Sequence, residues 1–338
     1  MKVIFILSFL GIIFSLSAKG MAEGETAAAL DVYCYSSFSS EWGPGPAISE
    51  AFKEKTGIRV SLHAPGDAVT VLNQLIFEQS SPRADVVVGL DNSLLRRALK
   101  ADILEAYKPP RLEDIPQALI FDSSYHLLPY DYGVFAINYD SLNIQEPPGT
   151  LEELSDERFR DKLVLIDPRT STAGLGFLLW TAAVYGDAWP DYWRRLRPSI
   201  LTVAESWSQG YALFAAGEVP LVLSYGTSPV YHAEYEQSDR YRAAEFSEGH
   251  LRQIEGMGIV KGTARRAAAE AFIDFMLEPE AQKLLALHNI MLPVNPKVPL
   301  PPSFSHAMRP AKELNADAFE APEAMDALID TWAKLYRR

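Results

Sequence analysis

The stretch that decides the fold is LVLIDPRTSTAGLGFLLW, residues 163–180. Its first four residues are apolar and predict a short buried strand. Three hydroxyl residues follow, Thr170, Ser171 and Thr172, and lead into a run of good helix formers that contains two glycines. A strand, a polar loop and a helix in this order make one unit of α/β structure. The loop is a candidate site, because ligands of open α/β sheets bind beyond the carboxyl ends of strands.

The same alternation of strand and helix recurs along the chain. Residues 84–90, ADVVVGL, form a continuous apolar run, which is typical of a strand buried on both faces. Two helices are predicted with capping boxes: 150–161 with Thr150 and Glu153, and 206–216 with Ser206 and Gln209. Further strands are expected at 30–35, 58–63, 201–204 and 219–225, and further helices at 46–56, 69–78, 92–101, 173–185, 263–277, 280–288 and 323–336.

A long extended segment, residues 127–138, separates two runs of these units. We therefore expect an α/β protein of two lobes, each a mostly parallel sheet flanked by helices, joined by extended crossing segments. Lobe 1 is assigned to residues 30–128 plus about 250–338, and lobe 2 to about 133–245. A ligand site belongs in the cleft between the lobes.

The N-terminus has the pattern of a secretory signal. Lys2 precedes an apolar run from Val3 to Leu16, and small residues follow up to Ala22. The run is short for a membrane-spanning helix, although an uncleaved anchor is the alternative. We expect residues 1–22 to be a cleaved signal peptide, with cleavage after Ala22 or else after Ala18, and a mature protein outside the cytoplasm.

Composition excludes several classes of partner. The chain of 338 residues carries a formal net charge of −13, and removal of residues 1–22 would remove two lysines and no acid. An acidic surface disfavours nucleic acid and anionic membranes as partners. A single cysteine excludes an internal disulfide, and no Cys and His cluster has metal-ligand spacing, so neither a metal nor a cofactor is expected.

Two loops carry hydroxyl groups at strand ends. Residues 167–172 open a helix whose free backbone N–H groups and dipole favour an anion, and Gly174 and Gly176 allow close approach. Residues 224–229, SYGTSP, end a second apolar strand in the same way. Each loop is interpreted either as a capped turn or as a cradle for a phosphate or hydroxyl group.

Aromatic and acidic candidates lie at other strand ends and helix starts. Tyr35 lies at the end of a predicted strand, Trp42 directly precedes the Gly-Pro turns of residues 43–46, and Trp207 opens a capped helix. Each of these rings either packs locally or offers a flat ligand surface. Asp67 precedes a helix and is either its N-cap or a ligand contact that accepts from an amine or faces a cation. A set of tyrosines, Tyr225, Tyr231 and Tyr235, leaves ferric iron open as an alternative ligand.

Catalytic motifs are not recognisable in the sequence. It contains neither a G-x-S-x-G nucleophile elbow nor an H-E-x-x-H zinc motif. A binding protein is therefore favoured over an enzyme. A secreted hydrolase of a small-molecule ligand or of phosphate esters stays open as an alternative, as does a binding protein for a polyamine or an anion.

Six motifs, in the same order, resemble the thiamine-binding periplasmic protein family. They are WGPGPAISEAF (42–52), ADVVVGLDNSLL (84–95), PYDYGVFAINYD (129–140), DPRTSTAGLGFLLW (167–180), LVLSYGTSPVYH (221–232) and AAEFSEGH (243–250). The similarity covers most of residues 30–295 and weakens toward the C-terminus. It implies a type II periplasmic binding protein, a "Venus flytrap" whose lobes close on thiamine, thiamine monophosphate or thiamine diphosphate. It also implies delivery to an ABC permease in the inner membrane with a cytoplasmic ATPase.

The resemblance implies a set of ligand contacts from both lobes. They are Tyr35, Ser36, Asp67, Ala68, Thr170, Ser171, Trp207, Ser224, Tyr225, Gly226, Thr227 and Ser228. Thiamine suits these residue types, because its aminopyrimidine is flat and its thiazolium is a permanent cation for aromatic faces. Asp67 would accept from the pyrimidine amine, and the hydroxyl loops would hold the alcohol or phosphate end.

Three positions depart from the family pattern. Ser36 stands where the resemblance leads us to expect Asp, Ala68 where Gly is expected, and Ile290 where a stacking Trp is expected. The loss of one aromatic ring face affects the affinity and the preferred phosphorylation state of the ligand. The sequence leaves both of these open, and the oligomeric state as well.

Overall fold

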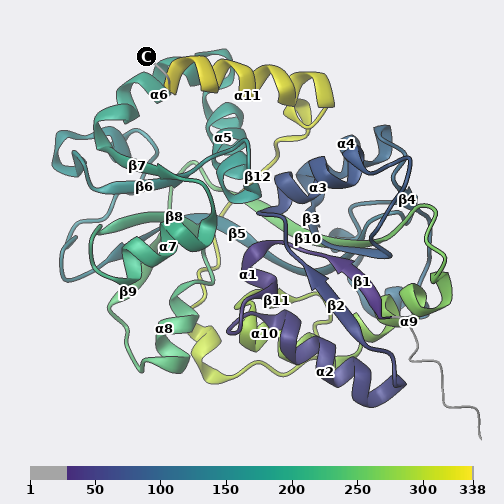
Figure 1. The fold of residues 1–338 in the computed structure, drawn as a ribbon. Helices are drawn as coiled ribbons and strands as arrows, with labels where there is room; N and C mark the ends of the chain where they lie inside the picture. Colours follow the sequence, from purple (N-terminus) through teal and green to yellow (C-terminus); the bar gives the residue numbers. More distant parts are fainter. Residues whose placement is uncertain (1–28, 337–338) are drawn as a thin grey trace, which may run out of the picture.

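The computed structural model describes residues 29–336. Two groups of helices and strands lie on either side of two long central strands, β5 (Leu128–Asp140) and β10 (His250–Val260), as Figure 1 shows. The strand order is β2-β1-β3-β10-β5-β8-β6-β7. The two-lobed α/β architecture predicted from the sequence is confirmed.

The first lobe is built from βα units at the N-terminal end of the chain. β1 pairs in parallel with both β2 and β3, and β3 is buried along its whole length. Gly57 ends α2 in a left-handed conformation, φ 77°, as its place after a helical run predicts. The elements are β1 (Leu30–Tyr33), α1 (Ser36–Ser39), α2 (Pro44–Thr56), β2 (Val60–His63), α3 (Ala68–Phe77), β3 (Val86–Asp91), α4 (Leu95–Lys100) and β4 (Leu104–Glu105).

The second lobe repeats this plan. β6 pairs in parallel with both β7 and β8, and helices connect them. The elements are β6 (Leu163–Ile166), α5 (Thr172–Tyr185), α6 (Trp189–Leu196), β7 (Ile200–Ala204), α7 (Trp207–Ala215), β8 (Leu221–Tyr225), α8 (Pro229–Tyr235) and β9 (Tyr241–Ala244). Each lobe thus has the expected parallel strands, with antiparallel pairs added by β5, β9 and β10.

β5 joins the two lobes as one continuous strand. Its first half, residues 128–134, pairs with β10, and its second half, residues 135–140, pairs with β8 and β9. β10 pairs with β3 of the first lobe on its other edge. The extended crossing predicted at residues 127–138 is therefore present, and side chains at the middle of β5 and β10 lie where the lobes meet.

The C-terminal part of the chain contacts both lobes. α9 (Arg266–Met276) and α10 (Pro279–His288) pack beside α2, and β11 (Leu292–Pro293) and β12 (Glu313–Leu314) extend the central strands. α11 (Pro322–Tyr336) packs on α6 (Figure 1). Trp332 of α11 meets Trp193 of α6 edge to face. We expected residues up to 338 in lobe 1, whereas this last helix lies against the second lobe.

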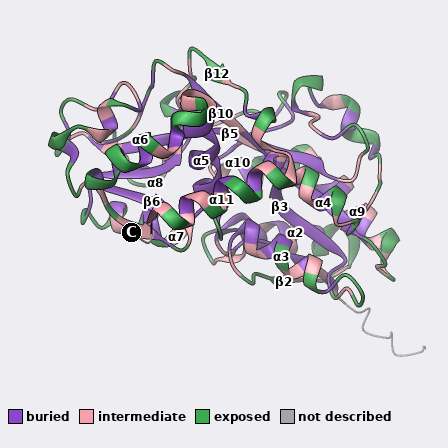
Figure 2. Cartoon of the chain, turned by 90° about the horizontal axis from the view of Figure 1, so that it is seen from above, coloured by how far each residue is buried: buried purple, intermediate pink, exposed green. Residues whose placement is uncertain are grey.

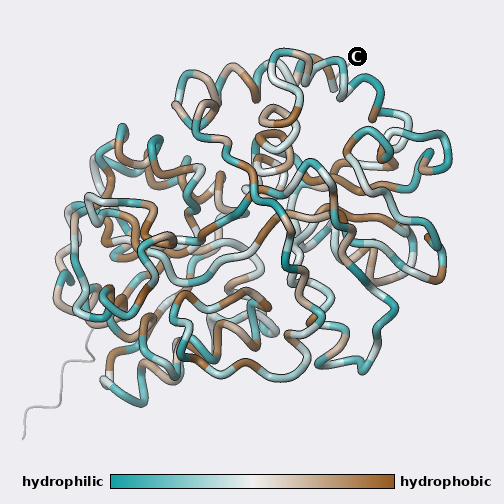
Figure 3. The backbone as a smooth tube through the Cα atoms, turned by 180° about the vertical axis from the view of Figure 1, so that it is seen from behind, coloured by the Kyte–Doolittle hydropathy of each residue, from teal (hydrophilic) through white to brown (hydrophobic). Residues whose placement is uncertain are grey.

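The hydrophobic core follows the strands of both lobes. Figure 2 shows the strands and the inner faces of the helices buried, with exposed residues on the outer helix faces and loops. Seen from behind, hydrophobic segments run through the inside of both halves (Figure 3). One cluster packs α2 and α9 against β1 and β3, and a larger one surrounds α5 and joins it to the start of α3.

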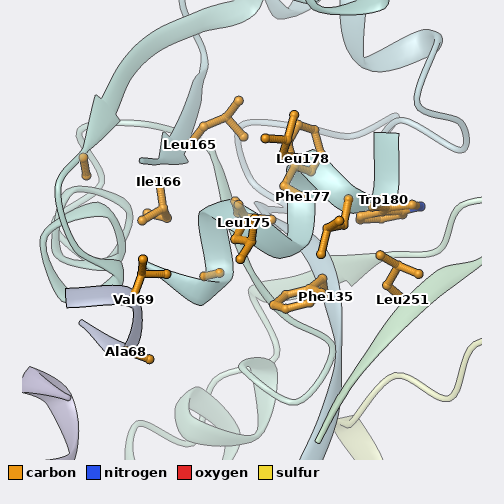
Figure 4. Packing of buried hydrophobic residues seen from close by; sticks show 14 of the residues in the cluster. Ala68, Val69, Phe135, Leu165, Ile166, Leu175, Phe177, Leu178, Trp180 and Leu251 are labelled. Atoms are coloured by element: carbon orange, nitrogen blue, oxygen red, sulfur yellow. The ribbon is translucent and has the colours of Figure 1, made fainter. Parts of the chain in front are cut away.

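Helix α5 is apolar on nearly all sides because it packs on strands of the sheet, among them β5, β6 and β8, and on α6. Figure 4 shows its side chains, such as Leu175 and Phe177, near Ile166 and Phe135, with Val69 of the first lobe near its start. A side chain at Gly174 would overlap the Ile166 carbonyl, and one at Gly176 would overlap the ring of Phe135. The two glycines therefore allow close helix–strand packing, and our interpretation of them as ligand approach points is wrong.

The helix predicted at 150–161 is also wrong. Its capping pair forms, because Glu153 N–H donates to Thr150 Oγ1 at 3.0 Å, but the segment folds into two 3₁₀ turns, Glu153–Ser155 and Glu157–Phe159. Asp156 between them is extended, with ψ 147°. Ser and Asp favour such breaks because their side chains compete for backbone hydrogen bonds.

The predicted signal peptide, residues 1–22, lies outside the described residues. Within residues 29–336, no helix has the length and apolar character needed to cross a bilayer.

Candidate ligand-binding site

A cavity of about 540 Å³ lies between the two lobes. The first lobe contributes the ends of β1 and the start of α3, the second contributes α7, α8 and the end of β8, and β10 contributes Glu255. Its walls are formed by Tyr35, Ser37, Glu41, Trp42, Asp67, Ala68, Ser171, Thr172, Trp207, Ser208, Tyr211, Ala212, Ala215, Tyr225, Thr227, Ser228, Tyr231, Tyr235, Glu236, Glu255, Leu287, His288, Asn289, Ile290 and Met291. Strand ends and helix starts dominate this set, as the α/β rule predicts.

Asp67 connects the two lobes across this cavity. Its backbone carbonyl starts α3 by accepting from Val71 N–H, while its carboxylate accepts the backbone N–H of Trp207 at 2.9 Å, at the first turn of α7. Burial raises the pKa of Asp67, and the Trp207 N–H and the neighbouring Ser171 hydroxyl oppose that shift. The carboxylate therefore occupies a position that helix starts offer to an anion.

Aromatic rings form much of the wall on the second-lobe side. Trp207 stacks on Tyr211 with ring centroids 5.0 Å apart and an interplanar angle of 22°. Trp42 and Tyr225 lie tilted beside Trp207 at 6.3 and 6.4 Å. The indole N–H of Trp207 donates to Ser224 Oγ at 2.8 Å, which fixes the plane of its ring. Rings held in this way suit a flat ligand that stacks or a cation that lies over a ring face.

The charge of the cavity wall has one sign. Glu41, Asp67, Glu236 and Glu255 line it, and the set contains neither lysine nor arginine. Glu236 accepts from His232 at 2.7 Å, and burial lowers the pKa of that histidine. A wall of carboxylates and ring faces favours a cationic ligand, because both attract positive charge.

Hydroxyl groups from both predicted loops face the cavity. Ser171 and Thr172 come from the start of α5, and Thr227 and Ser228 from the loop after β8. Ser224 lies behind them and shares a hydrogen bond of 2.7 Å with Ser228 Oγ. These groups offer a ligand several neutral donors and acceptors.

Eight of the twelve candidate residues line the cavity, and four do not. The Ser224 hydroxyl accepts a hydrogen bond from the indole N–H of Trp207. The backbone N–H of Gly226 donates to the Val134 carbonyl on β5, and the Gly226 carbonyl accepts from the N–H of Met308. Ser36 donates its N–H to Gly66, and Thr170 directs its hydroxyl to the Glu205 carbonyl at 2.6 Å. The lining candidates are Tyr35, Asp67, Ala68, Ser171, Trp207, Tyr225, Thr227 and Ser228.

Several lining residues were not among the candidates. Glu255 and Asn289 approach from β10 and from the end of α10, and Tyr211 lies one helical turn after Trp207. A lone acid within the apolar run IEGMGIV, residues 254–260, was the available signal for Glu255. Tyr35 connects this group, because its hydroxyl donates to Glu255 at 2.8 Å and lies 3.1 Å from Asn289 Oδ1.

Two of the three departures from the family pattern lie in the cavity wall. Ala68 is buried at the first turn of α3, next to Asp67. Ile290 follows the end of α10 with φ 56°, a left-handed conformation that is strained for a β-branched residue. It contributes an aliphatic surface where the resemblance implies an indole ring.

The described residues bear on the ferric-iron alternative. Within residues 29–336, His, Cys, Asp and Glu side chains form no group of three that could hold a metal ion. Tyr225, Tyr231 and Tyr235 do line the cavity, but burial and nearby carboxylates raise the pKa of Tyr225 well above its ordinary value, which disfavours the phenolate that ferric iron needs.

Comparison with known proteins places the chain. Residues 81–317 match the family model described as bacterial extracellular solute-binding protein. The chain is 39% identical over 316 residues to the thiamine-binding periplasmic protein of Salmonella typhimurium, covering 91% of this chain and 94% of that one. It superposes on a solved periplasmic thiamin binding protein with a TM-score of 0.86 and 38% identity, covering 92% and 96% of the two chains.

A ferric binding protein from Campylobacter jejuni has the same fold, with a TM-score of 0.74, 19% identity and coverage of 90% and 99%. At that identity the likeness concerns the fold alone. The relatives above are solute-binding proteins, so the hydrolase alternative is set aside. The chain therefore belongs to the bacterial extracellular solute-binding proteins and, among them, to the thiamine-binding periplasmic protein family.

Proposed function

We propose that this protein is the periplasmic receptor of an ABC importer, and that it binds thiamine in the cavity between its lobes. The observation that carries the proposal is the composition of the cavity wall. It combines four acidic side chains with stacked and tilted aromatic rings, and neither lysine nor arginine is among the described residues that line it. Thiamine is a flat, permanently cationic molecule, and both kinds of group attract such a cation.

The same wall bears on the phosphate esters. The anion position at the start of α7 is taken by the Asp67 carboxylate, and no lysine or arginine lines the cavity. A phosphate tail would have to lie toward the opening, held by neutral hydroxyls such as those of Ser171 and Thr227. We therefore propose that thiamine monophosphate and thiamine diphosphate enter, but that the phosphates add no affinity.

The proposed role in transport rests on the family to which the chain belongs and not on the composition of the cavity wall. We propose that a cleaved signal peptide, residues 1–22, directs the chain to the periplasm. The loaded receptor delivers thiamine to an inner-membrane permease driven by a cytoplasmic ATPase. The ligand is cargo, so the protein needs no cofactor. Closing and opening is a hinge equilibrium that the ligand shifts toward the closed state. The lobes are proposed as residues 30–128 with part of the C-terminal region, and about 133–245.

Calorimetric titration with thiamine and its two esters tests the proposal. We expect binding of all three, with the esters no tighter than thiamine, and a large loss of affinity for Trp207→Ala. Phe77→Ala, an aromatic truncation at a side chain that is 84% exposed and outside the cavity, is the matched control and should bind normally. Absence of heat and of thermal stabilisation with millimolar thiamine would refute the proposal.

Ferric iron and polyamines are the competing ligands. Titration with ferric citrate, followed by visible absorbance, detects a tyrosinate–iron band if Tyr225, Tyr231 and Tyr235 hold the metal. Spermidine serves as the polyamine probe. Binding of either in place of thiamine would move the protein to another ligand class within the same fold.

A further inference from the structure

Three buried acids lie side by side across the central strands. Glu255 of β10 is in register with Asp91 of β3 on one side and with Asp131 of β5 on the other. Their exposed fractions are 5% for Glu255, 1% for Asp91 and 0% for Asp131. Of the three, Glu255 lines the cavity. Glu255 therefore lies at the cavity, and Asp91 and Asp131 are buried beside it on the neighbouring strands.

The row has no positively charged partner within the described chain. Arg252, on the same strand, pairs with Glu313 at 2.6 Å. Neutral donors serve the acids instead: Tyr35 and Tyr130 donate to Glu255, and Asn289 Nδ2 donates to Asp131 at 2.7 Å. Asp91 accepts from Ser93 and from Gln253. Buried carboxylates without a cation are costly, so the row needs either protons or a cationic ligand.

Asp131 and Glu255 are the two acids of the row that hold a proton. Asp131 Oδ1 is buried and has no hydrogen-bond donor in the structure, and Asp131 is the cross-strand partner of Glu255. Repulsion between two neighbouring buried carboxyl groups disfavours the doubly ionised state, so the pair keeps at least one proton near pH 7. Burial raises the pKa of Glu255 to about 7, and burial together with Glu255 raises the pKa of Asp131 well above its ordinary value.

We propose that Glu255, supported by Asp131, is the counter-charge for the positively charged ring of the ligand, and that the carboxyl pair releases the proton of Glu255 to solvent when the ligand binds. This inference rests on the proposed function, because it takes the cavity to be the thiamine site. Atoms and charges balance in this step. The carboxyl pair loses one proton, the bound cation replaces the positive charge of that proton, and the O–H bond is the one covalent bond that breaks. Thiamine binding is thus coupled to the release of a proton.

The other titratable groups that face Glu255 do not supply the released proton. Burial raises the pKa of Tyr35, Tyr130 and Tyr225 well above the ordinary value, so all three remain neutral near pH 7. Burial raises the pKa of Asp91 to about 6, which leaves it mostly ionised at pH 7 and adds a negative charge beside Glu255. The negative charge of Asp91 favours retention of the Glu255 proton when the ligand is absent.

Calorimetry of thiamine binding in buffers of different ionisation enthalpy tests the exchange. At pH 7 we expect release of roughly half a proton per thiamine, rising toward one at pH 6 and falling toward zero at pH 9. The dissociation constant should rise by up to about tenfold for each pH unit below 7. Glu255→Gln should bind at least about tenfold more weakly and release no proton, whereas Glu54→Gln, at an exposed position on α2, should match the wild type.

Asp131→Asn provides a second variant that does not remove Glu255. Asn keeps the position beside Glu255 neutral and nearly unchanged in shape, so thiamine should bind and release about as much proton at pH 7 as in the wild type. Loss of proton release in this variant would assign the released proton to Asp131 and contradict the proposal. Binding heats that are the same in all buffers, or unchanged proton release by Glu255→Gln, would overturn the exchange and leave thiamine binding intact. Absence of thiamine binding in every buffer would instead refute the proposed function.

Discussion

The carboxylate of Asp67 accepts the backbone N–H of Trp207 at 2.9 Å, although 140 residues separate the two in the sequence. One residue starts α3 in the first lobe and the other starts α7 in the second. The contact lies at the edge of the cavity and is joined by a weaker backbone bond from Thr70 N–H to the Thr170 carbonyl at 3.4 Å. We therefore expect Asp67 to act as an interlobe latch, a contact that forms when the lobes close.

Removal of the latch should weaken ligand binding through closure. A hydrogen bond to a charged group contributes about 1.5–3 kcal/mol, so Asp67→Ala should weaken thiamine binding by roughly tenfold to a hundredfold. Small-angle scattering with saturating thiamine should show a larger radius of gyration for the variant if closure is impaired. Asp67→Asn keeps an acceptor for the Trp207 N–H and should lose less. Equal affinity for Asp67→Ala and wild type would contradict the latch.

An aromatic side chain at position 290 should tighten binding. Ile290 lines the cavity and adopts φ 56°, which a β-branched residue tolerates poorly. Ile290→Trp removes the β-branch and adds a ring for the thiazolium, worth about 0.5–2 kcal/mol. Titration should therefore show thiamine affinity raised by roughly twofold to thirtyfold. Ile290→Leu, which removes the β-branch without adding a ring, separates the two effects, and a gain as large for Leu as for Trp would contradict the stacking argument.

The two neighbouring hydroxyls of the α5 loop should behave differently. Ser171 lines the cavity beside Asp67, so Ser171→Val should weaken thiamine and both phosphate esters. Thr170 is bonded to Glu205 and lies outside the cavity lining, so Thr170→Val should lower the free energy of unfolding by about 1 kcal/mol and leave affinity unchanged. Our interpretation from the sequence treated the pair as one phosphate cradle. A loss confined to the phosphate esters in Ser171→Val would restore that interpretation.

The stability of the ligand-free protein should depend on pH through Glu255. Burial raises the pKa of this acid from 4.5 to about 7, so its folded state prefers the protonated form. Its contribution to stability is complete below pH 4.5 and is lost as the pH rises through about 7. Glu255→Gln should match wild-type stability at pH 5 and exceed it at pH 8, by on the order of 1–3 kcal/mol. Denaturant unfolding at the two pH values measures this, and a difference that does not change with pH would contradict it.

Much of the scaffold follows from local sequence patterns. The apolar run at 84–90 and the hydroxyl stretch at 167–172 locate a buried strand and a helix start within one or two residues of β3 and α5. The rule that ligands bind at strand ends then brings Tyr35, Asp67 and Trp207 to one cavity. These predictions succeed because they depend on periodicity and on chain connectivity.

The remaining features depend on contacts between distant segments. The carboxylate of Asp67 contacts a helix that begins 140 residues later, which no local capping rule describes. The acid row of Asp91, Glu255 and Asp131 exists because three strands align in one register, with β10 inserted between β3 and β5. Taken singly in the sequence, each of the three residues is an isolated acid in an otherwise apolar strand. The sheet order that makes them neighbours lies beyond the reach of periodicity.

A crystal structure of the protein with thiamine tests the central claim most directly. The account predicts thiamine between the lobes, its pyrimidine and thiazolium rings among Trp207, Tyr211 and Tyr225. The thiazolium should lie within about 6 Å of the Glu255 carboxylate, the range over which opposite charges interact strongly. Thiamine bound outside the cavity, or bound with its cationic ring turned away from Glu255 toward the solvent, would contradict it.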